Sequence, residues 1–484
     1  MRAKRLLTGL VALALLALPQ PARADAVAFT NADVGFSEGS ATAGLTDRLD
    51  RMDAYVGDRK PILRLDLNWW AVQDCQTCAP NFAHLDPVVD AAAARGIRVL
   101  LILTYAPPWA NGNHDNDHWF PVRDADWSAI VNATVAHFKG KVQAYEVWNE
   151  PNFTFMGNYG DGSVAARRLR YWQLVRIAHA QVRAACADCV VLAGASGAGT
   201  VAADNSNPNE SAAWLDWAYT NGYGGDFDAV THHPYAPWSA GLGPSHPECS
   251  TPRWWNMFGP PDEKCGELAA VRAVMVKHGD SVKKIWGTEF GYPSTGTGAD
   301  AAQTRDYLEE GVRMWRALDY TGPLFLYSFA DSPRPDCAGN PDPECHFGLI
   351  DTAGNAKQPA YDSLQLALTD TRLESLAPGR SLHRASALRS SQGRFELWLQ
   401  GDGNLVLYQG PTVLWKVVNL KAVRLTNQPD GSLALFDVNN KKVWSTPTAG
   451  KGTSNLIMQN DGNLVLYPSA TPTKASWASN TCCH

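Results

Sequence analysis

Two glutamates stand at the ends of apolar, strand-like segments and could carry out acid–base or nucleophilic chemistry. Glu150 follows segment 142–148 in the sequence Asn-Glu-Pro, and Glu289 lies near the end of segment 284–290. Hydrolysis of a glycosidic bond needs one carboxyl group that donates a proton and a second that acts as nucleophile or base. Each glutamate could instead be a helix-start or solvated loop residue, because acidic side chains favour helix N-termini.

Charged and polar residues near these glutamates suggest how the pair would be supported. Arg64 lies in an otherwise apolar segment, where an unpaired charge is costly, so we expect a carboxylate partner and favour Glu289. Such a cation would lower the pKa of Glu289 and keep it ionised. His233 and Tyr235 are expected to orient the nucleophile and the sugar, although His233 could be a buried core histidine.

Eight short apolar segments alternate with helical patterns between about residues 26 and 370. The segments are 34–36, 62–67, 99–104, 142–148, 190–194, 227–231, 284–290 and 324–329, and the clearest helical patterns are 85–95, 126–138 and 164–185. Eight such units predict an α/β fold, a parallel sheet closed into a (β/α)8 barrel, with an open doubly wound sheet as the alternative. The carboxyl ends of barrel strands share one mouth, so Glu150 and Glu289 would face each other there.

These motifs together resemble the clan A glycoside hydrolases, with family 39 nearest and family 5 next. The resemblance covers about residues 30–368 and includes the segments 64–70, 106–110, 233–235, 347–351 and 357–361. It implies a retaining enzyme without a cofactor or a metal, in which Glu150 is the acid/base and Glu289 the nucleophile. Their carboxyl groups would be about 5–5.5 Å apart.

The substrate would be a polysaccharide or glycan bound by residues around this pair. We expect a hydrogen bond from Asn149 to the sugar 2-hydroxyl. Tryptophans could supply a stacking platform, although two or more of them are expected to be barrel packing; the candidates are Trp69, Trp70, Trp109 and Trp148. Tyr327 stands where the clan usually has a tryptophan, so the sugar stays unnamed. The full set of expected substrate-binding residues is Arg64, Trp109, Asn149, His233, Tyr235 and Tyr327.

Three copies of a short repeat follow residue 370 and indicate a second, all-β region. The copies are 400–408, 428–436 and 459–467, each followed by a tryptophan at 415, 444 or 477. They predict a threefold unit with the tryptophans packed centrally. In the first and third copies, side chains at a spacing of two would share one face of a strand and could bind a hexose, or could form only a solvated face. These candidates are Gln400, Asp402, Asn404, Tyr408, Gln459, Asp461, Asn463 and Tyr467.

The repeats resemble the bulb-type mannose-binding lectins over about residues 374–480. The resemblance implies a β-prism of three four-stranded sheets and binding of mannose-type sugars. The middle copy has Ser432 and Phe436 in place of Asn and Tyr, so we expect weak or no binding there. We expect a short linker at 375–379.

The N-terminus and the composition bear on where the protein acts. Residues 1–24 combine a basic start, an apolar run and the sequence Ala22-Arg23-Ala24, which is typical of a cleaved export signal. No later apolar run reaches 18 residues, so we expect no membrane span. The net charge is −6 without a basic patch, which disfavours nucleic acid as a partner. We therefore expect a secreted protein with a signal peptide (1–24), a hydrolase barrel (25–370) and a lectin domain (371–484).

Ten cysteines fit export to an oxidising compartment. They form the close pairs 75/78, 186/189, 249/265, 337/345 and 482/483. We expect local disulfides rather than zinc, because the two C-x-x-C pairs are too far apart for a zinc ribbon. The terminal pair could bond internally, bond between chains or stay free.

The sequence therefore favours a secreted retaining glycoside hydrolase with a lectin module. Two alternatives remain: a sugar-binding scaffold whose barrel is inactive, and an interaction factor led by the lectin region.

Overall fold

A computed structural model describes residues 29–39, 44–57, 59–197, 210–235, 267–295, 301–369, 375–383, 386–400, 402–418, 420–437 and 440–483. The expected signal peptide (1–24) and the pair Cys249/Cys265 lie outside these residues. Among the helices described, none combines the length and apolar character needed to cross a bilayer.

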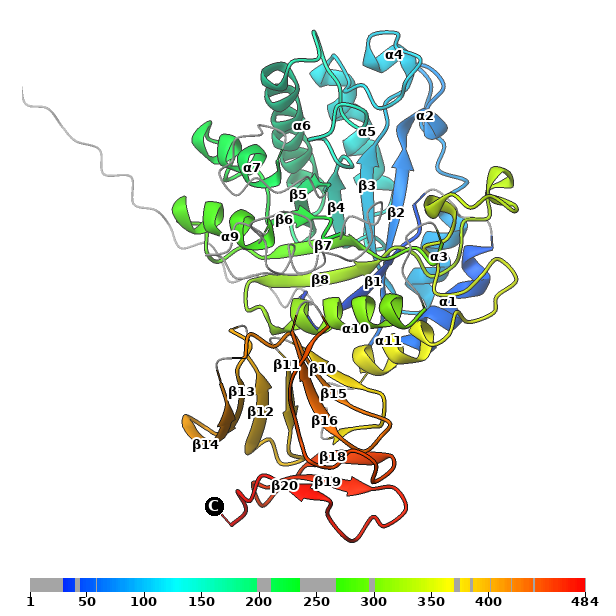
Figure 1. The fold of residues 1–484 in the computed structure, drawn as a ribbon. Coiled ribbons are helices and arrows are strands. Elements are labelled where there is room, and N and C mark those ends of the chain that lie inside the picture. The colour runs from blue at the N-terminus through cyan, green and yellow to red at the C-terminus, as the bar shows by residue number, and fades with distance from the viewer. Residues whose placement is uncertain are drawn as a thin grey trace, which may run out of the picture.

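The first region is a closed barrel of eight strands in sequential order (Figure 1). All neighbours pair in parallel, including β1 with β8, which confirms the expected barrel and excludes the open sheet. The strands are β1 (Val34–Ser37), β2 (Ile62–Asn68), β3 (Arg98–Thr104), β4 (Ala144–Val147), β5 (Val190–Ser196), β6 (Ala229–His232), β7 (Ile285–Phe290) and β8 (Thr321–Leu326).

Helices surround this barrel. They are α1 (Leu45–Tyr55), α2 (Trp69–Val72), α3 (Asp86–Ala94), α4 (Pro108–Asn111), α5 (Asp124–His137), α6 (Val164–Ala185), α7 (Ser211–Thr220), α9 (Glu267–Lys277), α10 (Ala301–Ala317) and α11 (Ala360–Thr369). Helix α6 has the expected bounds, and the Oγ of Ser163 caps it by accepting a hydrogen bond from the Ala166 amide at 3.2 Å.

Inward-facing side chains fill the barrel in layers, because alternate residues of a strand point the same way. The lowest layer is apolar and consists of Ile62, Leu100, Ala144, Leu192, Ala229, Trp286 and Phe325. Strand β1 contributes Gly35 at this level, where a Cβ would lie 2.1 Å from the Phe325 ring. Two residues further along β2 and β4, the next layer contains Arg64 and Glu146.

Strand β8 was expected at 324–329 but runs from Thr321 to Leu326. Its first half contains Gly322-Pro323, a pair that normally signals a turn. Gly322 is needed there because a Cβ would lie 2.6 Å from the Trp286 ring. Tyr327 consequently follows the strand instead of belonging to it.

The second region consists of three four-stranded antiparallel sheets, as expected for a β-prism. Its strands are β9 (Ser375–Leu376), β10 (Ser381–His383), β11 (Ser386–Arg389), β12 (Phe395–Leu399), β13 (Leu405–Gln409), β14 (Thr412–Val417), β15 (Arg424–Asn427), β16 (Leu433–Phe436), β17 (Lys442–Ser445), β18 (Ser454–Met458), β19 (Leu464–Pro468) and β20 (Trp477–Ala478). Trp415, Trp444 and Trp477 contact one another edge to face, with centroids 5.8–6.4 Å apart, which confirms their central packing.

The expected linker at 375–379 is wrong in part. Ser375 and Leu376 form β9, which pairs with β18 in the third sheet. Two residues carry too little pattern to indicate a strand whose partner lies far along the chain.

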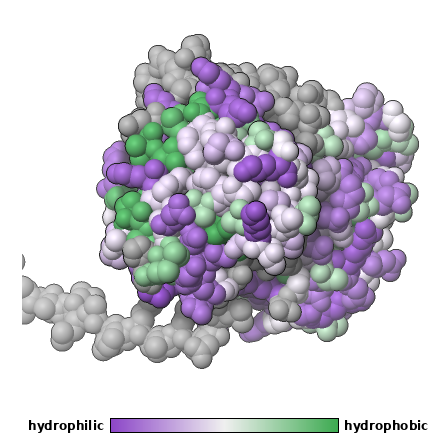
Figure 2. All heavy atoms as spheres, turned by 60° about the horizontal axis from the view of Figure 1, so that its bottom comes forward, coloured by the Kyte–Doolittle hydropathy of each residue, from purple (hydrophilic) through white to green (hydrophobic). Residues whose placement is uncertain are grey.

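The β-prism lies beneath α10 and α11 of the barrel (Figure 1). Arg380 Nη2 lies 2.6 Å from Glu309 Oε2 on α10, and Arg380 also donates to the Ser363 hydroxyl on α11. Seen from this end, the molecule is a mixture of polar side chains and separate apolar patches (Figure 2).

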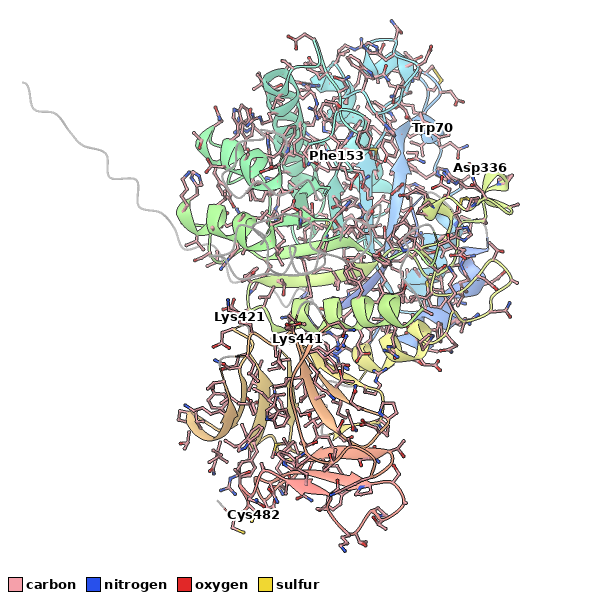
Figure 3. The ribbon with its side chains drawn as sticks, viewed as in Figure 1. Trp70, Phe153, Asp336, Lys421, Lys441 and Cys482 are labelled. Carbon is pink, nitrogen blue, oxygen red and sulfur yellow. A yellow bond between two sulfur atoms is a disulfide. The ribbon has the colours of Figure 1, made fainter. Side chains whose placement is uncertain are left out.

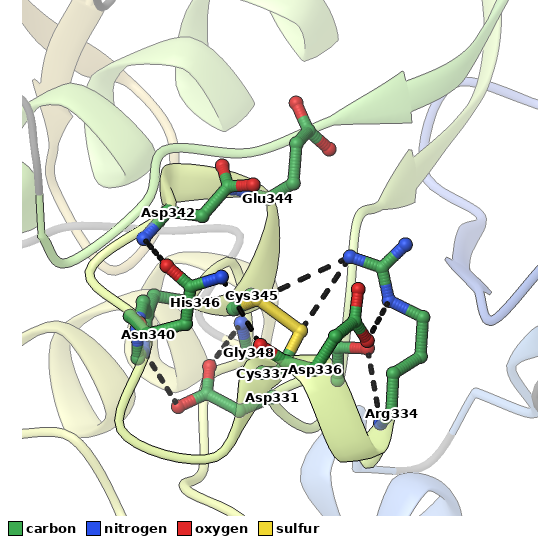
Figure 4. The surroundings of a disulfide bond; sticks show 11 residues. Asp331, Arg334, Asp336, Cys337, Asn340, Asp342, Glu344, Cys345, His346 and Gly348 are labelled. Carbon is green, nitrogen blue, oxygen red and sulfur yellow. Dashed lines mark hydrogen bonds and ion pairs between the residues drawn. A yellow bond between two sulfur atoms is a disulfide. The ribbon is translucent and has the colours of Figure 1, made fainter.

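Three expected disulfides are confirmed: Cys75–Cys78, Cys186–Cys189 and Cys337–Cys345. The last joins two short 3-10 helices, η1 (Pro335–Cys337) and η2 (Pro343–Cys345), in the loop after β8 (Figure 4). Cys482 and Cys483 are exposed free thiols whose sulfur atoms are 3.1 Å apart.

Candidate active site

Glu289 lies near the end of β7 and meets Arg64 of β2 across the barrel. Arg64 Nη1 is 2.5 Å from Glu289 Oε1, so the pairing expected from the sequence is present. The Tyr235 hydroxyl donates to the other oxygen, Oε2, at 2.9 Å. Both carboxylate oxygens therefore have fixed partners, which holds the group in one orientation.

Arg64 has a second carboxylate partner that sequence reasoning missed. Its Nε donates to Glu146 Oε2 at 2.7 Å, and the Thr288 hydroxyl donates to Glu146 Oε1 at 2.8 Å. The Glu146 side chain is fully buried. A signal was present, because Glu146 interrupts an apolar strand just as Arg64 does, and two such residues on barrel strands predict a buried pair.

The guanidinium of Arg64 has two further contacts. Nη1 also donates to Ser37 Oγ at 2.8 Å, and Nη2 donates to Asn149 Oδ1 at 3.0 Å. The latter bond orients the Asn149 amide, so that its Nδ2 is the group able to donate to a sugar hydroxyl.

Glu150 lies three residues after β4 and is held by His233. Trp148 and Glu150 both adopt left-handed backbone conformations, with φ of 65° and 44°, which are uncommon for residues other than glycine. The ring Nδ1 of His233 is 2.9 Å from Glu150 Oε1 and 3.7 Å from Glu289 Oε2. The two glutamates thus meet at one imidazole nitrogen.

Charges across this cluster favour an ionised Glu289. Burial by itself would raise the pKa of Glu289, but the charges of His233 and Arg64 and the hydrogen bonds from Arg64 and Tyr235 outweigh burial and lower that pKa. Burial opposes protonation of His233, yet Glu289 and Glu150 raise its pKa above the ordinary value.

A fourth carboxyl group, after Glu289, Glu146 and Glu150, belongs to this cluster and was not expected. Asp66 lies two residues after Arg64 on β2 and therefore points inward one layer nearer the mouth. Burial raises the pKa of Asp66 to about 6, although Arg64 acts to lower it.

Two of the expected substrate-binding residues, Tyr327 and Trp109, have no described hydrogen bond to the carboxylates of the site. Tyr327 contacts Tyr235 and Phe347, with ring centroids 6.3 and 5.1 Å away, so it lines the mouth. Trp109 packs edge to face on Trp69 and donates to the Gln73 carbonyl at 3.2 Å; its described contacts do not reach the carboxylates. The expectation that some tryptophans serve barrel packing is confirmed by two buried ones, Trp69 and Trp148.

The candidate sugar sites of the β-prism differ from the expected geometry. The strand of the first site begins only at Leu405, so the expectation of one continuous strand face is wrong. Gln400 and Asn404 close a hairpin turn, with the Gln400 amide donating to the Asn404 carbonyl at 2.8 Å. The turn still allows the side-chain Nε2 of Gln400 to donate to the Tyr408 hydroxyl at 2.9 Å. In the third site the Nε2 of Gln459 donates to the Tyr467 hydroxyl at 3.1 Å. The expected side chains therefore gather at a turn and the strand that follows it.

The two sites hold their asparagines differently. Asn404 Nδ2 donates to Asp402 Oδ2 at 2.6 Å. Asn463 Oδ1 instead accepts from Ser479 Oγ at 3.2 Å and from the Thr481 amide at 3.3 Å. In the third site the Asp461 carboxylate accepts from the Asn463 backbone amide at 2.9 Å.

Comparison with known proteins finds different relatives for the barrel and for the β-prism. No family model matches the chain. A family 39 glycoside hydrolase from Bacteroides cellulosilyticus WH2 superposes with a TM-score of 0.56 at 18% identity, covering 89% of this chain and 79% of that one. A monomeric beta-xylosidase from Caulobacter crescentus CB15 superposes with a TM-score of 0.51 at 18% identity, covering 78% and 72%. The barrel region therefore has the fold seen in family 39 glycoside hydrolases.

The second region has a relative in sequence as well. A mannose-specific lectin from Aloe arborescens is 35% identical over 83 residues, which are 16% of this chain and 74% of that protein. The C-terminal part of the chain belongs to the mannose-specific lectin family.

Proposed function

We propose that the protein is a secreted retaining glycoside hydrolase that carries a lectin module for mannose-type sugars. The observation that carries this proposal is the meeting of Glu150 and Glu289 at the Nδ1 of His233. Two carboxylates at the mouth of a barrel, one of them paired with a buried arginine, supply the groups that glycoside hydrolysis needs.

The proposed roles follow from the surroundings of each group. Glu289 has a lowered pKa and would be the ionised nucleophile that attacks the sugar. Glu150 would protonate the departing oxygen and then act as base toward water. Glu150 Oε1 and Glu289 Oε2 lie 2.9 and 3.7 Å from the same Nδ1 atom, so these two oxygens are close together, as the ~5–5.5 Å carboxyl separation of retaining enzymes requires. That proximity favours retention.

Substitution of each glutamate tests these roles separately. We expect Glu289→Gln to reduce turnover of 4-nitrophenyl glycosides by several orders of magnitude with an unchanged fold, because an amide cannot form the glycosyl–enzyme. A variant that keeps more than a tenth of wild-type activity would contradict the assignment. The sugar is identified by a panel that includes the β-xyloside, β-mannoside, β-glucoside and β-galactoside.

Replacement of Glu150 is expected to behave differently. Glu150→Ala should still be glycosylated by substrates with very good leaving groups, and added azide should restore turnover and yield an azido-sugar of retained configuration. Absence of both effects would remove Glu150 from the acid/base role. Turnover by neither the wild type nor any variant would favour the inactive scaffold.

The remaining parts of the proposal concern export and the division of the chain. Export is supported by the N-terminal pattern in 1–24 and by the three described disulfides. The proposed division near residue 370 agrees with the end of α11 at Thr369 and the start of β9 at Ser375.

A further inference from the structure

The loop after β4 presents two stacked aromatic rings at the mouth of the barrel. The centroids of Phe153 and Phe155 are 5.2 Å apart and the rings are nearly parallel, at 11°. Phe155 is 63% exposed. Exposing a large ring costs free energy, and the stacked geometry shows that the two rings form one apolar platform rather than scattered surface residues.

This platform lies directly beside Glu150. A Cβ placed on Gly197 would be 2.1 Å from Cε2 of Phe153 and 2.6 Å from Oε1 of Glu150, so the ring edge and the carboxylate flank the same point. The Phe153 amide also donates to the Glu150 carbonyl at 3.1 Å. The chain therefore joins the carboxyl group and the platform through one short turn.

The platform is held in place from the neighbouring loop. The Phe155 carbonyl lies 2.7 Å from the ring Nδ1 of His118, and His118 packs on Tyr105 with centroids 4.6 Å apart. We call Tyr105, His118, Phe153 and Phe155 the aromatic rim. Figure 3 shows Phe153 over the barrel, well separated from the β-prism.

We propose that the aromatic rim is a binding subsite for the leaving-group side of the substrate, taking the apolar face of a neutral pyranose that continues the chain beyond the cleaved bond. This proposal rests on the proposed function, in which Glu150 protonates the departing oxygen. The leaving sugar must then lie next to Glu150, where the structure places the edge of Phe153, with Phe155 stacked on that ring. Rings of this kind offer an apolar face on which a sugar ring can stack.

The inference predicts that the rim matters only when a leaving sugar is present. A glycosyl fluoride carries the glycone but has no sugar as its leaving group. A β-1,4-linked tetrasaccharide with that glycone has a sugar on each side of the cleaved bond. With the glycone identified by the nitrophenyl panel, Phe155→Ala should lower kcat/KM on the tetrasaccharide about tenfold and leave kcat/KM on the fluoride within a factor of two. Phe155→Tyr should retain both rates, because it keeps the ring.

A matched control separates the subsite from general effects of a surface change. Val282 is 83% exposed and precedes β7, at the end of the barrel away from the mouth, so Val282→Ala should change neither rate. Equal losses on fluoride and tetrasaccharide, or no loss on either, would overturn the proposal.

A binding measurement decides the inference even without turnover. The variant Glu289→Gln with Asn404→Ala and Asn463→Ala should be retarded in native gels that contain xylan or glucomannan, and adding Phe155→Ala should remove the retardation. Loss of retardation in the Phe155→Ala variant would support the rim as a binding site. If no glycoside on the panel were hydrolysed, that result would refute the proposed function but not the rim. Unchanged retardation would refute the rim.

Discussion

Replacing Arg64 by methionine should separate the structural and catalytic roles of the buried ion cluster. The Glu146 side chain is fully buried and bonded to Arg64 Nε at 2.7 Å, so the variant leaves a buried anion without its cation. Removing one partner of a buried pair costs about 3–5 kcal/mol. A loss of about 1 kcal/mol lowers the melting temperature by about 2–4 °C in a domain of about 150–250 residues, and by less in a larger one. We therefore expect the melting temperature of this larger barrel to fall by on the order of 5 °C.

The double variant Arg64→Met with Glu146→Met tests the reason for that loss. It removes both charges and replaces them with side chains that can pack, a change that is often neutral in stability. The hydroxyls of Ser37 and Thr288 lose their partners, at about 1 kcal/mol each. The double variant should therefore regain part of the stability that the single variant loses, while both remain inactive because Glu289 has lost its cation.

Calorimetric unfolding at pH 7 and turnover of a nitrophenyl glycoside measure the two effects. The matched control is Arg95→Met, since Arg95 pairs at 2.7 Å with Asp50 at the surface and such pairs contribute about 0–1 kcal/mol. A double variant no more stable than Arg64→Met would refute the explanation by an unpaired buried charge.

Three further outcomes are expected. Tyr235→Phe removes a hydrogen bond that lowers the pKa of Glu289, so the acidic limb of the kcat/KM profile should move to higher pH; an unmoved limb would contradict this. Burial raises the pKa of Glu38 from 4.5 to about 7, so the stability that its protonated form contributes is present below pH 4.5 and lost as the pH rises through 7. Glu38→Gln should therefore raise the melting temperature at pH 8 but not at pH 4, as thermal scans across pH will check. In titrations of mannan into the Glu289→Gln protein, Asn463→Ala should weaken binding more than Asn404→Ala, because Ser479 and Thr481 fix the Asn463 amide whereas Asn404 donates to Asp402; equal losses would refute this.

The sequence was sufficient to predict the barrel, because eight apolar segments separated by helical patterns leave few other arrangements. It also predicted the pairing of Arg64 with Glu289, since a buried cation needs a carboxylate. The charge of Glu146 inside an apolar strand was visible, but its partner Arg64 was not, because β2 and β4 each pair with β3 and not with each other. Pairwise strand register is not visible in either strand alone.

Other errors arose where local patterns have two interpretations. Gly322-Pro323 indicates a turn, yet it lies inside β8 because packing against Trp286 excludes a side chain at that position. In the first lectin repeat, alternation suggested one strand, although Asp402-Gly403 is a turn signal of the kind common in hairpins. The stacked platform of Phe153 and Phe155 was not predicted, because loop geometry decides which rings stack.

The bond between Arg380 and Glu309 has a consequence for how the two halves of the molecule would work on a polymer. Because Arg380 contacts both α10 and α11, a mannose unit bound to the β-prism as proposed and a bond cleaved in the barrel would be separated by a restricted span. On a stiff glycan, only bonds at that span from a mannose branch are within reach, so cleavage would follow the spacing of the branches. A flexible glycan could fold back, so its bonds would be cut more evenly. The lengths of the fragments released from stiff and flexible glycans would therefore report the distance between the lectin site and the active site.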